Sequence, residues 1–311
     1  MIKRQPSFKG NIVEKIIEIL FNGLTMGTIY ALIALGFVLI FKSTGVLNFA
    51  HGELCMVGAF VCYNFATLLN VPYLISFLIA ITIGALLGAT INILFLRKMV
   101  GEPIYSTIMI TLGLASILTC FAGLIWGHDY YSIRSPFMAK TVSMGEMVFS
   151  QAALYTIGIS MLLFALFIFF FKRSLLGVAL KGTAEDSDTA GLMGINVKKM
   201  HAIAWTIGTI VAVVAGVFLA EQSFVQSSMR HTGIKAMSAA ILGGLESLGG
   251  AIIGGLIIGI VEGLVASYFS GLEIGGFHFG DVKDVAAFAI MVLVLMIRPH
   301  GIFGQKEVER V

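Results

Sequence analysis

The segment KRSLLGVALKGTAEDSDTAGLMGINVKKMH, residues 172–201, is a polar island between two long apolar runs. The 311-residue chain around it is 58% hydrophobic and only 12% charged, with a mean hydropathy of +0.97. This composition offers too little polar surface for a water-soluble fold, so the lipid bilayer is the expected solvent. Charged residues are costly there, and a cluster of them predicts an exposed segment with a function.

Runs that lack acidic and basic residues predict the membrane-spanning helices, because a span needs about 20 apolar helical residues. One run is twice that length, and Pro72 disfavours helix at the residue before it, so residues 70–72 are the expected hairpin. We therefore predict a single all-α membrane domain over residues 1–311, with about eight helices and one or two discontinuous or re-entrant segments. The predicted helical segments are 19–41, 54–96 (counted twice), 104–127, 147–171, 202–220, 247–268 and 283–298.

Basic residues orient these helices, because cytoplasmic loops are enriched in Lys and Arg. The island at 172–201 has the largest basic cluster of any loop and is predicted to be cytoplasmic, which puts the hairpin and the loop at 128–146 outside. The same count sends the basic N-terminus outside. Residues 1–15 could form an amphipathic helix at the membrane interface, which we favour. The alternative is that one of the apolar runs does not cross the membrane as a simple span. The basic C-terminal tail is cytoplasmic only if a discontinuous segment lies at 236–250.

Glycine pairs mark this segment as the expected break. The pairs at 243–244 and 249–250 flank Glu246, and irregular backbone at membrane depth is tolerated only where protein or water covers it. Close packing is the alternative, because small residues at intervals of four let helices approach each other. We favour the broken helix here and close packing for the glycines after residue 250.

A second irregular segment is KSTGVLNFAHGE, residues 42–53, which combines flexible backbone with hydrogen-bonding side chains. It suits either a tight cytoplasmic turn or unwound helix that lines a pathway. His51 and Glu53 alone are too few ligands for a metal site, and the three cysteines fit neither a metal nor a disulfide pattern. We expect no metal and no cofactor.

The run NGLTMGTIYALIALGFVLIFKSTGVLNFAHGELCMVGAF resembles the start of bacterial ABC-transporter permeases of the branched-chain amino acid family, Liv type. The resemblance covers nearly the whole chain. Its elements are Tyr-Ala-Leu at 30–32, Asn-Phe-Ala-His-Gly at 48–52, Ala-Glu-Asp at 184–186, Gly-Ile-Asn at 194–196, Leu-Gly-Gly at 242–244 and Arg-Pro-His-Gly at 298–301.

This resemblance implies a permease subunit, and not an enzyme, in an ATP-driven importer of leucine, isoleucine or valine in the bacterial cytoplasmic membrane. The sequence contains no Gly-x-x-x-x-Gly-Lys-Ser/Thr phosphate loop, so ATP hydrolysis is expected in partner subunits. The implied partners are two ATP-binding subunits, a second homologous permease in a heterodimer, membrane lipid, and an external substrate-binding protein over residues 128–146 and 221–235. No nucleic acid is expected.

Within the island, the resemblance implies a short helix that inserts into the ATP-hydrolysing subunit. Thr183 is expected to cap its N-terminus, the acidic residues suit the positive end of the helix dipole, and Gly191 or Gly194 is expected to end it. The implied coupling residues are Thr183, Ala184, Glu185, Asp186, Gly191, Gly194, Ile195 and Asn196.

A path for an apolar amino acid needs a few polar groups in an apolar wall. The candidate path residues are Tyr30, Asn48, His51, Gly52, Glu53, Gly243, Gly244 and Glu246. The sequence leaves urea, short amides and aromatic acids open as substrates. The rival classes are a self-sufficient secondary transporter, which needs inverted repeats and an ionisable site at the midplane, and a passive channel, which needs a polar constriction.

Overall fold

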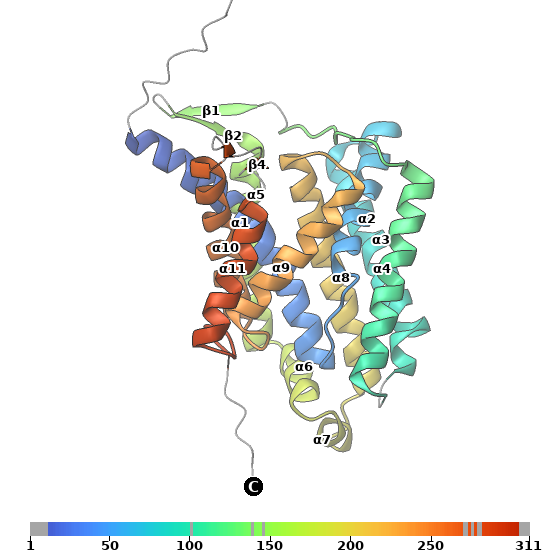
Figure 1. The fold of residues 1–311 in the computed structure, drawn as a ribbon. Helices are drawn as coiled ribbons and strands as arrows, with labels where there is room; N and C mark the ends of the chain where they lie inside the picture. Colours follow the sequence, from blue (N-terminus) through green and yellow to red (C-terminus); the bar gives the residue numbers. More distant parts are fainter. Residues whose placement is uncertain are drawn as a thin grey trace, which may run out of the picture.

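Long apolar helices lie side by side and form the body of the molecule in the computed structural model (Figure 1). The structure describes residues 12–99, 102–137, 140–144, 147–269, 273–274, 277–278 and 282–304. Six of the described helices are long and apolar enough to cross a membrane. They are α1 (Ile12–Thr44), α3 (Tyr73–Leu94), α4 (Ile104–Trp126), α5 (Gln151–Arg173), α8 (Val197–Gln222) and α10 (Leu248–Phe269).

Three shorter helices pack among them: α2 (His51–Tyr63), α9 (Arg230–Gly243) and α11 (Val282–Ile297). The π-helix η1 (Asn64–Leu68) continues α2. Six of the eight predicted segments are thus confirmed as long helices, whereas the other two form the shorter α2 and α11. The additional discontinuous segment predicted at 236–250 is confirmed by the end of α9 and the start of α10.

Small elements occupy the two ends of the bundle (Figure 1). The helices α6 (Leu175–Glu185) and α7 (Ser187–Leu192) project from one end, called here the α7 end. The antiparallel hairpin of β1 (Thr141–Met144) and β2 (Met147–Ser150) lies at the other, the β1 end. Short connecting elements are η2 (Leu96–Lys98), η3 (Ser227–Met229) and the antiparallel pair β3 (Glu273–Ile274) and β4 (Phe277–His278).

The turn between α2 and α3 confirms the predicted hairpin. Asn70 has a positive φ of 52°, and Pro72 is the N-cap of α3. The side chain of Asn70 accepts a hydrogen bond of 2.9 Å from Arg134, in the loop before β1. The hairpin and this loop therefore lie at the same end, as the charge pattern predicts.

The chain ends also follow the predicted alternation. The first part of α1 lies at the β1 end, where Phe21 packs edge-on against Phe149 with ring centroids 4.6 Å apart. The segment after α11 lies at the α7 end (Figure 1), where Ile302 donates its backbone hydrogen bond to Leu242. Residues 1–11 of the predicted amphipathic segment lie outside the described residues, and from Ile12 onward the chain is part of α1.

Glycines bring α1 and α10 into close contact along the centre of the bundle. A Cβ atom on Gly255 would lie 2.4 Å from the Cα of Ala31, and one on Gly259 would lie 2.2 Å from the Cα of Gly27. Both distances are too short for any side chain, so the backbones touch here. The close packing predicted for the glycines after residue 250 is confirmed, and it explains why α10 lacks large residues on this face.

Candidate functional site

The polar island folds into two short helices that project from the α7 end. Ser174 caps α6, its Oγ accepting a 2.8 Å hydrogen bond from the backbone of Gly177. Asp186 caps α7, and its Oδ1 accepts from the backbone N–H groups of Asp188 and Thr189 at 2.9 and 3.0 Å. Serine and aspartate are preferred at this position because their oxygen satisfies N–H groups that have no partner inside the helix.

The predicted cap at Thr183 is wrong. Thr183 lies in the last turn of α6, where its buried hydroxyl donates to the carbonyl of Ala179 at 2.5 Å. The helix that contains Thr183 already begins at Ser174, so the chain turns out of it only at Asp186, whose φ of −155° and ψ of 105° are extended. The sequence pattern did not reveal that two helices would replace one.

The far end of the projection follows the prediction more closely. Gly191 lies inside α7, whereas Gly194 has a φ of 85° and follows its end. The backbone N–H of Ile195 returns to the carbonyl of Ala190 at 3.0 Å, as in a glycine-terminated helix. Asn196 then caps α8 by accepting from the N–H of Lys199 at 3.0 Å. The glycine stop is thus at Gly194.

Two large apolar side chains are exposed at the tip of this projection. Leu192 is 89% exposed and Met193 is 80% exposed. Helix α7 lies beyond the ends of the apolar helices (Figure 1). The tip is therefore separate from the exposed apolar residues on α3, α4 and α5, which suit contact with lipid. An apolar tip rimmed by polar residues is typical of a surface that binds another protein.

The candidate path residues Asn48, His51 and Gly52 lie together where α2 begins inside the bundle. Asn48 and His51 are fully buried, and the Asn48 side chain accepts a 3.0 Å hydrogen bond from the backbone of Ala50. The His51 ring packs against Phe37, with centroids 4.5 Å apart. These contacts make His51 a packed core residue at the end of the extended segment that enters from the α7 end.

The α9–α10 break lies elsewhere. Gly244 has a φ of 102°, and a Cβ on Gly243 would lie 2.1 Å from the carbonyl oxygen of Gly250. Glu246 is exposed at the α7 end, and its carbonyl accepts a 2.8 Å hydrogen bond from Lys42 at the end of α1. Gly243, Gly244 and Glu246 are therefore not brought together with His51.

A charged cluster between four helices was not predicted. Lys235 in α9 forms ion pairs with Glu262 in α10 at 2.8 Å and with Asp284 in α11 at 2.5 Å. The second oxygen of Glu262 accepts a 2.5 Å hydrogen bond from the hydroxyl of Tyr30 in α1. Tyr30, a candidate path residue, thus belongs to this cluster. The available signal was Glu262 itself, an isolated carboxylate in an otherwise apolar helix.

Comparison with known proteins places these features in a family. The profile of the family described as "Branched-chain amino acid transport system / permease component" matches residues 19–295. The chain belongs to this family. It is a multi-pass permease component of the cytoplasmic membrane, and not itself the ATP-hydrolysing subunit. This confirms the resemblance noted from the sequence motifs.

Relatives match over nearly their whole length. The high-affinity branched-chain amino acid transport system permease protein LivH of Escherichia coli K12 is 34% identical over 309 residues, which cover 94% of this chain and 96% of LivH. BraD of Pseudomonas aeruginosa is 33% identical over 313 residues, covering 94% and 97%. The solved structure of PsaBC from Streptococcus pneumoniae has a TM-score of 0.51 at 15% identity, covering 94% of this chain and 98% of that chain, and so shows a shared fold.

Proposed function

We propose that this chain is the membrane subunit through which an ATP-driven importer passes branched-chain amino acids into the cytoplasm. The family match and the names of the relatives LivH and BraD support this substrate class. Two ATP-binding subunits bind at the α7 end, a second permease completes the pathway, and an external binding protein delivers substrate at the β1 end. The basic residues of the island support a cytoplasmic α7 end.

The exposed apolar tip is the observation that carries the coupling part of this proposal. Leu192 and Met193 offer an apolar contact to an ATP-binding subunit, and α7 is joined to α8 by only a few residues. Helix α6 packs against α1, α5 and α8. A displacement of the tip is therefore transmitted to the central helices, which is the rigid-body tilting that alternating access requires.

The direct test replaces Leu192 and Met193 by serine in the tagged chain, expressed with its partners. Both side chains are exposed and make little contact within the subunit, so the variant should fold and reach the membrane. We expect loss of most of the copurifying ATP-binding subunit, since large apolar anchors contribute most of the binding energy at interfaces.

The matched control is Tyr130→Ser, which removes an exposed aromatic residue at the β1 end. It should leave the recovery of the ATP-binding subunit unchanged. Wild-type recovery in the Leu192→Ser/Met193→Ser variant would contradict the proposed docking surface. Equal losses in the variant and the control would indicate a general defect of assembly and would contradict it as well.

A further inference from the structure

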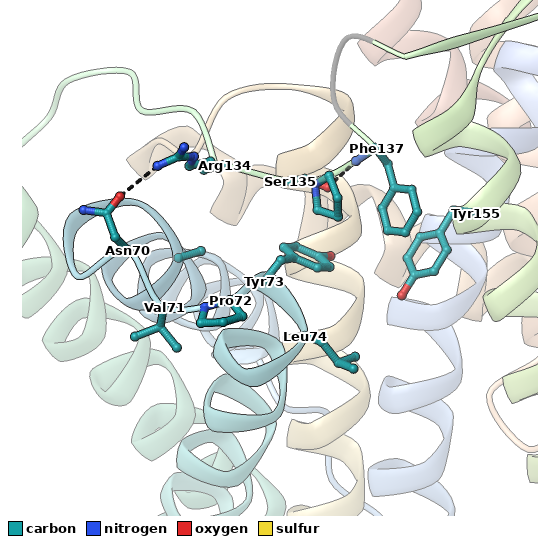
Figure 2. Close-up of a pocket in the computed structure, with 11 residues that line it drawn as sticks. Asn70, Val71, Pro72, Tyr73, Leu74, Arg134, Ser135, Phe137 and Tyr155 are labelled. Atoms are coloured by element: carbon teal, nitrogen blue, oxygen red, sulfur yellow. Dashed lines mark hydrogen bonds between the residues drawn. The ribbon is translucent and has the colours of Figure 1, made fainter.

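A pocket of about 690 Å³ opens at the β1 end, between the α2–α3 turn, the loop before β1 and the N-terminal part of α5. Figure 2 shows its lining, with Tyr73, Phe137 and Tyr155 on one side and Arg134 and Asn70 on the other. Its volume lies within the range of about 300–1,000 Å³ that is typical of small-molecule sites. None of the candidate path residues predicted from the sequence lines it.

A buried carboxylate lies directly behind this lining. Glu221, in the last turn of α8, is 6% exposed, and its Oε1 accepts a 2.7 Å hydrogen bond from the hydroxyl of Ser135. Its Oε2 lies beside the hydroxyl of Tyr73, which is the second side-chain partner of this carboxylate. Neither of the ion pairs among the described residues includes Glu221. A buried acid without a cation is costly, which favours a site that binds one.

Aromatic rings form the wall in front of Glu221. Phe137 stacks on Tyr155 with centroids 4.4 Å apart and meets Tyr73 edge-on at 6.2 Å. The carboxylate of Glu221 lies close to the hydroxyls of both tyrosines, directly behind this wall. Aromatic faces next to a carboxylate are the chemistry that recognises an ammonium group, through cation–π attraction and charge-assisted hydrogen bonds.

The rim carries the opposite charge. Arg134 directly precedes Ser135, which bonds Glu221, and one of its guanidinium nitrogens donates to Asn70 at 2.9 Å. The guanidinium has five donors in a planar fork, and among the described residues only Asn70 takes one of them, so the fork can bind a carboxylate. The pocket therefore presents an acid and aromatic rings inside, a base at the rim, and apolar side chains such as Val71 and Leu74 between them.

We propose that this pocket is the outer substrate site of the permease, where Glu221 and the rings of Tyr73 and Tyr155 hold the α-ammonium group of an amino acid and Arg134 holds its α-carboxylate. The inference rests on the proposed function, and it adds a defined site to it. Released substrate would meet this site first, before the helices open the central path. The site selects a zwitterion and accepts an apolar side chain, whereas urea offers neither charge.

The test measures leucine binding by saturation-transfer NMR with the purified wild-type complex, without the binding protein. Leucine amide lacks the carboxylate, and 4-methylpentanoate lacks the ammonium group. We expect Glu221→Gln to weaken leucine binding about 10-fold, as befits a lost charge-assisted bond. The variant should then no longer prefer leucine over 4-methylpentanoate. Arg134→Ala should instead abolish the preference for leucine over leucine amide.

Glutamine has nearly the shape of glutamate and can still accept the Ser135 bond, so a purely structural role of Glu221 would leave binding unchanged. Glu246→Gln, at the exposed α7 end, is the matched control and should bind leucine as the wild type does. The proposed substrate site would be overturned if Glu221→Gln bound leucine as the wild type does, or if the wild type bound no leucine.

ATP-driven leucine uptake by the wild type in proteoliposomes, with the binding protein added, separates the two claims. If the wild type takes up leucine while Glu221→Gln binds leucine unchanged, or while the wild type shows no binding, the proposed pocket is overturned. Either combination leaves the proposed function standing. If the wild type takes up no leucine, the proposed function fails, and the pocket fails with it.

Discussion

Gly52 in α2 and Gly233 in α9 touch backbone to backbone, so closely that a Cβ on Gly233 would lie 2.4 Å from the Cα of Gly52. A Cβ on Gly52 would in turn lie 2.3 Å from the carbonyl oxygen of Arg230. Two short helices therefore begin next to each other inside the bundle, one directed to each end. Their contact joins the first half of the chain to the second.

Replacing Gly52 by alanine should disrupt this junction. The new methyl group meets backbone atoms, which cannot move aside as a flexible side chain can, and we expect the free energy of unfolding to fall by about 1–3 kcal/mol. Thermal unfolding in mild detergent measures the loss. Gly113→Ala in α4 is the matched control, because nothing lies within 4 Å of a Cβ there. An unfolding temperature of Gly52→Ala equal to that of the control would refute the contact.

The ion pairs of Lys235 with Glu262 and Asp284 should stabilise the fold, and Lys235 is the residue that both pairs share. Replacing Lys235 by methionine leaves Glu262 buried without its cation, and we expect destabilisation by about 3–5 kcal/mol. Asp284→Asn should cost less, about 0–1 kcal/mol, because the Asp284 side chain is 52% exposed.

A double variant provides the decisive comparison for this cluster. Lys235→Met combined with Glu262→Gln removes both buried charges, so it should be more stable than Lys235→Met alone. Thermal unfolding of Lys235→Met, Glu262→Gln and the double variant, each compared with the wild type, reports the coupling. If the losses in unfolding free energy of the two single variants simply add up in the double variant, the two charges act independently. That result would rule out the pairing of Lys235 with Glu262.

The cap of α7 should order the coupling projection. Asp186→Ala removes the acceptor of the Asp188 and Thr189 N–H groups, so amide hydrogen exchange over residues 187–192 should accelerate at neutral pH. Asp188→Ala is the control, since it removes an equal charge but no cap. Equal exchange in the two variants would show that the cap does not order this helix.

The same cap predicts a pH dependence. Hydrogen bonds from the Thr189 hydroxyl and backbone favour the charged form and hold the pKa of Asp186 below its ordinary value of 3.8. The stabilisation is therefore fully present above that value and is lost only as the pH falls through the lower folded pKa. Recovery of the ATP-binding subunit should show no step from Asp186 between about pH 5 and pH 8. A step that is present in the wild type and absent in Asp186→Ala would contradict this.

Local chemistry made part of the fold predictable from the sequence. Pro72 and the uncharged runs predicted the hairpin between α2 and α3, and the glycine pairs around Glu246 predicted the break between α9 and α10. Each of these signals acts through the backbone of its own segment. The predicted glycine stop of the projection, at Gly191 or Gly194, belongs to the same class and lies at Gly194, whereas Thr183 was misplaced because Ser174 starts the helix earlier.

The contacts between distant segments could not be predicted in this way. Glu262 and Lys235 lie on different helices, and nothing in the local pattern of either one indicates the other. Glu221 was noted only as the edge of an external loop, because its pocket is assembled from the α2–α3 turn, the loop before β1 and α5. Packing determines these sites, and one sequence contains no direct record of packing.

The central claim is that ATP hydrolysis by partner subunits drives transport through this chain. The most direct test purifies the tagged chain from its native membranes in mild detergent and reconstitutes what copurifies into proteoliposomes. Radiolabelled leucine should accumulate only with ATP and the external binding protein, and the recovered complex should contain ATP-binding subunits and a second permease. Accumulation by the chain alone, without ATP and driven by an ion gradient, would contradict the account and identify a secondary transporter.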